Sequence, residues 1–120
     1  MRLNMVRGDR AVFELAIRDA VGDALSLAGK ELYFTAKTAV SDLDADAVIV
    51  KAIATGIVVT DEAGGIAEVT IDPADTEDLT AETTLVYDVE MRDPVTSDVA
   101  TVVLGTLLVV PDVRQGTVAP

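Results

Sequence analysis

Apolar and polar residues alternate with a period of two along most of this chain, a pattern typical of half-buried β-strands. In the first clear example the apolar face carries Ala11, Phe13, Leu15 and Ile17. The pattern predicts strands over residues 11–17, 30–38, 47–54, 57–60, 66–71, 83–92 and 99–110, with a short step at 25–27. Gly105 is expected to break the last strand near its middle.

Turn residues separate these segments. Gly22 lies in a predicted turn at 19–23, and residues 61–65 carry two glycines between strands, a strong indication of a hairpin. Residues 41–47 are expected to form a loop or a single helical turn. Asp72 followed by Pro73 predicts the N-cap and first position of a short helical turn near 73–79.

This spacing of short strands predicts an all-β fold, an immunoglobulin-like antiparallel sandwich of seven or eight strands. The 120 residues fit one domain over 1–112, followed by a flexible tail over 113–120. Only four residues are aromatic, so the core must be largely aliphatic. We expect Phe13, Phe34 and Tyr87 to lie between the two sheets.

The residues available for chemistry are few. The chain has no histidine and no cysteine, which removes the commonest general base near neutral pH and the Ser–His and Cys–His nucleophile pairs. No nucleotide-binding motif is present. We therefore expect a protein that is not an enzyme, with no catalytic residue and no cofactor.

Charge is unevenly distributed along the chain. The formal net charge is −12, and residues 52–91 hold ten acidic side chains and no basic one. Direct binding to nucleic acid is disfavoured, because phosphate contacts require basic patches. We expect this acidic segment to face solvent or a basic partner.

Neither export nor membrane insertion is predicted. The first ten residues have no apolar core of signal-peptide length. The longest uncharged stretch, residues 99–111, has thirteen residues, whereas a membrane-spanning helix needs about twenty.

Asp42, Asp44 and Asp46 alternate in a way that can offer oxygen ligands to Ca²⁺. The EF-hand loop requires glycine at its sixth position and glutamate at its twelfth, and those positions hold Ala47 and Ile53. We therefore predict an acidic loop and no metal site.

Two other polar motifs are interpreted as a turn and a helical turn, and not as binding or catalytic sites. Arg7-Gly8-Asp9 copies an integrin-binding tripeptide, but Gly8 and Asp9 are interpreted as a turn entering the first strand. A cluster of carboxylates is interpreted as a charged helical turn with acidic residues favourably placed at its N-terminus, namely Asp75, Glu77, Asp78 and Glu82.

The last predicted strand is apolar on both faces, whereas an exposed sandwich face should alternate with polar residues. One face holds Val103, Leu107 and Val109, and the other holds Val102, Leu104, Leu108 and Val110. Either the domain itself covers both faces, or another subunit covers the second one. Val102, Leu104, Leu108 and Val110 are the predicted interface residues.

Several short motifs occur in an order that a known family shares. They are Arg7-Gly8-Asp9, Leu25-Ser26-Leu27-Ala28-Gly29 after a glycine-bearing turn, Leu32-Tyr33-Phe34-Thr35-Ala36-Lys37, Thr55-Gly56-Ile57, Gly64-Gly65, Asp72-Pro73-Ala74-Asp75-Thr76 and Ala100-Thr101-Val102. Through them, over roughly residues 6–112, the chain resembles the small immunoglobulin-like domain of tailed-phage virion proteins, such as the N-terminal domain of baseplate upper proteins.

The resemblance implies a structural module of a phage or prophage particle with no catalytic or cofactor residues to carry over. We expect no receptor-binding or fibre segment after the domain, which puts a baseplate role in doubt and leaves room for a free-standing capsid decoration, tail or connector subunit. We expect location in the virion and other virion proteins as partners, in a homo-oligomer or multi-copy assembly. The alternative is an adhesin-like module that recognises a host cell-surface ligand.

Overall fold

The computed structural model describes residues 2–112, so the tail predicted for 113–120 lies outside the described residues. These residues form eight strands, which are β1 (Arg2–Val6), β2 (Ala11–Ala16), β3 (Glu31–Lys37), β4 (Ile49–Ala52), β5 (Ile57–Asp61), β6 (Ile66–Ile71), β7 (Thr83–Arg92) and β8 (Val99–Val110). A 3₁₀ turn η1 (Asp44–Asp46) and a one-turn helix α1 (Pro73–Thr76) complete the elements.

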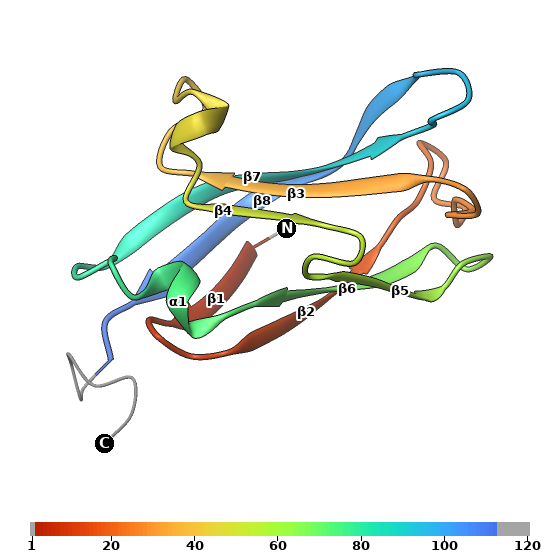
Figure 1. Cartoon of the computed structure of the whole chain (residues 1–120). Coiled ribbons are helices and arrows are strands. Elements are labelled where there is room, and N and C mark those ends of the chain that lie inside the picture. The colour runs from red at the N-terminus through yellow and green to blue at the C-terminus, as the bar shows by residue number, and fades with distance from the viewer. Residues whose placement is uncertain (1, 113–120) are drawn as a thin grey trace.

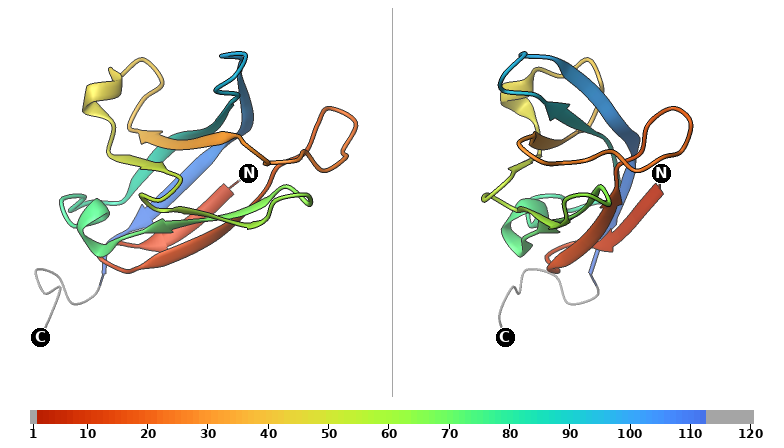
Figure 2. Two further views of the ribbon diagram at one scale, coloured as in Figure 1. Left: turned by 45° about the vertical axis from the view of Figure 1, so that its right-hand side comes forward. Right: turned by 90° about the vertical axis from the view of Figure 1, so that its right-hand side faces the viewer.

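The strands form two sheets that face each other (Figures 1 and 2). One sheet has five strands in the order β1-β8-β7-β3-β4, and the other has three in the order β2-β6-β5. Lettering β2 to β8 as B, C, C′, D, E, F and G gives the sheets G-F-C-C′ and B-E-D. This is the strand arrangement of an immunoglobulin-like sandwich, and the predicted fold class is confirmed.

Strict alternation along the strands builds the core between the sheets. In β3 the even-numbered residues Leu32, Phe34 and Ala36 are fully buried, and β6 and β7 repeat the pattern. The rings of Phe34 and Tyr87 stack with centroids 5.0 Å apart and planes 25° from parallel. Both side chains lie between the sheets as predicted, whereas Phe13 is half-buried at the margin of the core.

Strand β1 was not predicted. It pairs in parallel with the end of β8, from Arg2 opposite Thr106 to Val6 opposite Val110. The sequence reveals little of this strand, because only Leu3 and Met5 face the core and the partner strand lies about a hundred residues away. Strand β8 is therefore an inner strand of its sheet, and β1 forms the edge.

A cluster of contacts fastens β1 to the opposite end of the chain. Arg7 Nε donates to the carbonyl of Glu77 at 2.9 Å, and Arg7 Nη1 pairs with Asp112 Oδ1 at 2.8 Å. The amide of Gly8 donates to Thr76 Oγ1 at 2.9 Å. These bonds hold the turn after β1 against helix α1 and the exit from β8.

The predicted break at Gly105 is wrong, since β8 runs without interruption through that residue. Gly105 pairs with Tyr87 on β7 and adds no side chain of its own beside that large inward ring. The irregularity lies further along, where Val89 pairs with Val103 but Glu90 pairs with Thr101. Val102 is the extra residue of this bulge.

Helix α1 begins at the predicted residues but is shorter than the predicted span of 73–79. The backbone amide of Asp72 donates to Asp75 Oδ2 at 2.7 Å, and Pro73 occupies the first turn. Lys51 Nζ, on β4, lies 3.0 Å from Asp72 Oδ2 and 2.8 Å from Asp75 Oδ2. Burial alone would lower the pKa of Lys51, but hydrogen bonds with Asp75 and Asp72 hold that pKa above its ordinary value. This triad links the two sheets.

Candidate functional site

The outer face of the five-stranded sheet carries a row of side chains that crosses four strands. Strand register aligns Leu104 on β8 with Asp88 on β7, Asp88 with Thr35 on β3, and Thr35 with Val50 on β4. The ends of the row are apolar and exposed, with 69% of Leu104 and 60% of Val50 accessible to solvent. A neighbouring row brings Glu90 beside Tyr33.

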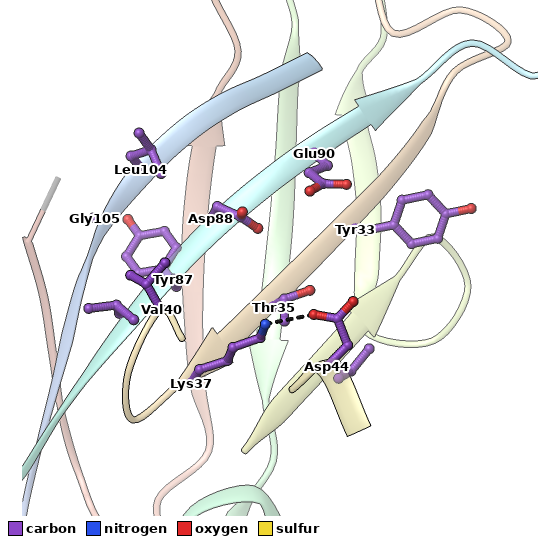
Figure 3. Close-up of a pocket in the computed structure, with 12 residues that line it drawn as sticks. Tyr33, Thr35, Lys37, Val40, Asp44, Tyr87, Asp88, Glu90, Leu104 and Gly105 are labelled. Carbon is purple, nitrogen blue, oxygen red and sulfur yellow. Dashed lines mark hydrogen bonds and ion pairs between the residues drawn. The ribbon is translucent and has the colours of Figure 1, made fainter. Parts of the chain in front are cut away.

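These rows form the floor of a groove of about 530 Å³. Figure 3 shows Asp88 and Glu90 projecting from β7 between Leu104 on one side and Thr35 and Tyr33 on the other. The connection between β3 and β4 contributes Val40 and Asp44 to the lining. The groove is therefore acidic along its middle and apolar at its margins.

The one lysine of the groove lining is already engaged. Lys37 Nζ lies 2.6 Å from Asp44 Oδ1 and donates to the carbonyl of Asp42 at 3.0 Å. The hydrogen bond from Lys37 to the Asp44 carboxylate holds the pKa of Asp44 below its ordinary value. Within residues 2–112, no ion pair or hydrogen bond is found for the side chains of Asp88 and Glu90.

Burial shifts the pKa of the Asp88 carboxyl upward, in the direction opposite to the shift at Asp44. Partial burial raises the pKa of Asp88, the Lys37 charge lowers it, and the nearby Asp44 charge adds to the rise, so that the net effect is upward. The charged form of Asp88 is thus disfavoured in the folded domain. A cation entering the groove would relieve that penalty.

A second ion pair borders the groove. Arg92 Nη1 pairs with Glu31 Oε1, and the hydroxyl of Tyr33 donates to Glu31 Oε2 at 3.1 Å. The Arg92 and Tyr33 bonds together lower the pKa of Glu31. The arginine nearest to Glu90 on its own strand is therefore committed to another carboxylate.

The predicted interface residues do not all lie on one face. Leu104, Leu108 and Val110 point outward from β8, because Leu107 and Val109 between them are fully buried in the core. Val102 is half-buried and packs against the core. The bulge at Val102 shifts the alternation by one residue, which the prediction of a regular strand did not include.

The predicted acidic loop does not gather its carboxylates. Asp44 is paired with Lys37, and Asp42 Oδ2 accepts hydrogen bonds from the Thr38 hydroxyl and the Ala39 amide. In the described part of the chain, no three His, Cys, Asp or Glu residues are grouped so that they could hold a metal ion.

The other two motifs have structural surroundings. Arg7 points into the cluster with Glu77 and Asp112, and Gly8 has a φ of +77°. The tripeptide forms the turn between β1 and β2, so it enters the second strand and not the first as predicted. Of the carboxylates near α1, Asp75 accepts a bond from the Asp72 amide.

No helix among residues 2–112 has the length and apolar character required to cross a membrane. A scan against protein-family models finds no match, and a search of curated proteins finds no relative.

Proposed function

We propose that this chain is a non-catalytic structural subunit of a phage or prophage particle, which works by assembly through the outward face of β8. The observation that carries the proposal is the contrast between the two faces of this strand. Leu107 and Val109 are fully buried, whereas Leu104 on the other face is 69% exposed.

The outward face continues from β8 onto β1, where the polar residues Arg2 and Asn4 precede one apolar residue, Val6. Val6 lies beside Val110 in the parallel pairing and is 36% exposed. Burying a fully exposed aliphatic side chain is worth about 1.5–3 kcal/mol, and Val6, Leu108 and Val110, which are already partly covered within the domain, would each contribute a fraction of that to an assembly. Strand β1 is also an edge of its sheet, where backbone groups are open to further pairing. A single partner could therefore cover the outward face and extend the sheet at the same time.

The composition of the groove supports assembly over ligand capture. An adhesin-like site for a cell-surface sugar would favour an aromatic platform, but the groove offers only Tyr33 and the buried Tyr87. The hydroxyl of Tyr33 is bonded to Glu31. The most exposed apolar side chains of the row are aliphatic, with Leu104 69% and Val50 60% exposed.

Light scattering on the purified chain tests the assembly claim. We expect the parent to form concentration-dependent oligomers and Leu108→Lys to remain folded and monomeric. Val58→Lys is the matched control, since Val58 is 60% exposed on the outer face of the other sheet. A parent that stays monomeric at millimolar concentration, or a control variant that dissociates equally, would contradict assembly through β8.

Particle composition tests the phage role separately. Mass spectrometry of tailed particles purified from the bacterium that encodes the chain should detect it in many copies per particle. Its absence from such particles would refute the virion location and leave the β8 interface to be explained differently.

A further inference from the structure

The acidic groove and the outward face of β8 near β1 are different parts of one sheet surface. The second part contains Leu108, Val110 and Val6 and no carboxylate. The groove has Asp88 and Glu90 at its centre and Leu104 and Val50 at its ends. A partner that fits one part need not fit the other.

We propose that the groove binds an extended segment of a different protein that carries a lysine or arginine, with an apolar residue two positions before it and another two positions after it. The basic side chain meets Asp88 and Glu90, and the two apolar side chains cover Leu104 and Val50. This inference rests on the proposed role as an assembly subunit and names the chemistry of one partner.

The spacing of the groove fits this segment. Adjacent strands lie about 4.8 Å apart, so the three steps from β8 to β4 separate Leu104 from Val50 by about 14 Å. An extended chain rises about 3.3 Å per residue, so side chains four positions apart on one face are separated by about 13 Å. The residue midway between them lies over the gap between Asp88 and Thr35.

Charge selects the middle residue of that segment. The lining holds one cation, Lys37, and three carboxylates, Asp44, Asp88 and Glu90, which leaves a net charge of −2. Lys37 and Asp44 pair with each other. An incoming ammonium or guanidinium group therefore finds two carboxylates without ionic partners among the described residues, and charge complementarity of this kind selects partners.

The same charges disfavour a second copy of this chain in the groove. A two-fold axis through the groove would place Asp88 and Glu90 of one copy against the same residues of the other. Like charges juxtaposed at an interface are strongly unfavourable. Homotypic contact is therefore expected at the β1 end of the sheet, where the outward residues of β1 are Arg2, Asn4 and Val6 and include no carboxylate, and a basic partner is expected in the groove.

A peptide titration followed by NMR tests the proposal. The probe is the synthetic peptide acetyl-Gly-Val-Ser-Lys-Ser-Val-Gly-amide, added to the isotopically labelled full chain. We expect amide shift changes to concentrate at Leu104, Asp88, Thr35 and Val50, and binding to weaken as NaCl is raised from 50 to 500 mM. A matched peptide with Glu in place of Lys should bind at least about tenfold more weakly.

Two double variants locate the charge effect. Asp88→Asn with Glu90→Gln should weaken binding of the lysine peptide about tenfold, while the fold is retained. The control is Glu14→Gln with Glu68→Gln, two carboxylates that face each other in the register of β2 and β6 on the other sheet. This control should leave binding unchanged.

The outcomes separate this inference from the proposed function. Equal affinity for the lysine and glutamate peptides, or shift changes centred on β1, would overturn the basic-segment proposal. If the parent forms oligomers and Leu108→Lys is monomeric, the assembly role stands even when the basic-segment proposal fails. Loss of peptide binding in the groove variant alone would support the inference, whatever the oligomeric state.

Discussion

Replacing Tyr87 by phenylalanine should stabilise this domain. Tyr87 is 3% exposed, and its hydroxyl is a buried polar group that finds no hydrogen-bond partner among the described residues. The substitution keeps the ring that stacks on Phe34 at 5.0 Å. It removes only the hydroxyl, so packing between the sheets is preserved.

The magnitude follows from the cost of leaving a hydroxyl buried and unpaired, about 1–3 kcal/mol from measurements on protein variants. Phenylalanine recovers most of this cost, and we expect the free energy of unfolding to rise by about 1–2 kcal/mol. For a domain of this size each kcal/mol corresponds to about 4 °C in Tm. The expected increase in Tm is therefore about 4–8 °C.

Alkaline pH provides a second readout of the same group. Burial raises the pKa of Tyr87 above its ordinary value of 10.0. A group whose pKa is raised by folding contributes stability below its unfolded pKa and loses that contribution as the pH rises through the folded pKa. The advantage of Tyr87→Phe over the parent should therefore widen above pH 10.

Urea denaturation at pH 7 and pH 10.5 measures both effects, with the slope m checked for constancy. Tyr33→Phe is the control for the measurement at pH 7, because Tyr33 is half-buried and its hydroxyl is bonded to Glu31, so that its removal should give no gain there. If Tyr87→Phe lowers the free energy of unfolding by about 1 kcal/mol or more, the hydroxyl has a partner, such as a bound water, and the reasoning fails.

Four further substitutions test the core, the groove and two turns. Phe34→Ala should cost about 3–5 kcal/mol in a denaturant titration, because the side chain is fully buried; an unchanged midpoint would contradict the assigned strand faces. Asp88→Asn should be more stable than the parent at pH 7, and the difference should vanish below about pH 4, since folding raises the pKa of this carboxyl. Gly56→Ala should cost about 1–3 kcal/mol, because Gly56 has a φ of +126° and a Cβ there would lie 2.5 Å from Lys51 Cδ. Gly8→Ala, where nothing lies within 4 Å of the added Cβ, should cost less, and thermal melts of the two variants measure the difference.

Local pattern was sufficient for most of the fold. The alternation in 83–92 and the extent of 99–110 predicted β7 and β8 with their observed bounds. The Asp72-Pro73 pair correctly marked the start of α1. These features depend on residues close together in the sequence, so the local alternation and the capping residues are enough to reveal them.

Features that depend on distant pairing could not be predicted. Strand β1 requires its partner β8, and the inward turn of Val102 follows from a bulge that only the β7 register defines. The alternation in 83–92 is enough to place Asp88 and Glu90 on the face opposite the buried Tyr87 and Val89. Their meeting with Leu104 and Val50 depends on the strand order of the sheet, which periodicity does not specify.

The parallel pairing of β1 with β8 also determines how the domain responds to tension. Both strands run in the same direction, and β1 begins opposite Thr106 while the chain leaves β8 beside Arg7. A force pulling residue 2 and residue 112 apart would slide the two strands past each other along their axes. All five residue pairs of the ladder would then resist together instead of opening one after another. The Arg7–Asp112 ion pair would add to this resistance at the end where tension enters, so the barrier to forced unfolding, which governs the rate, would be concentrated in this one ladder.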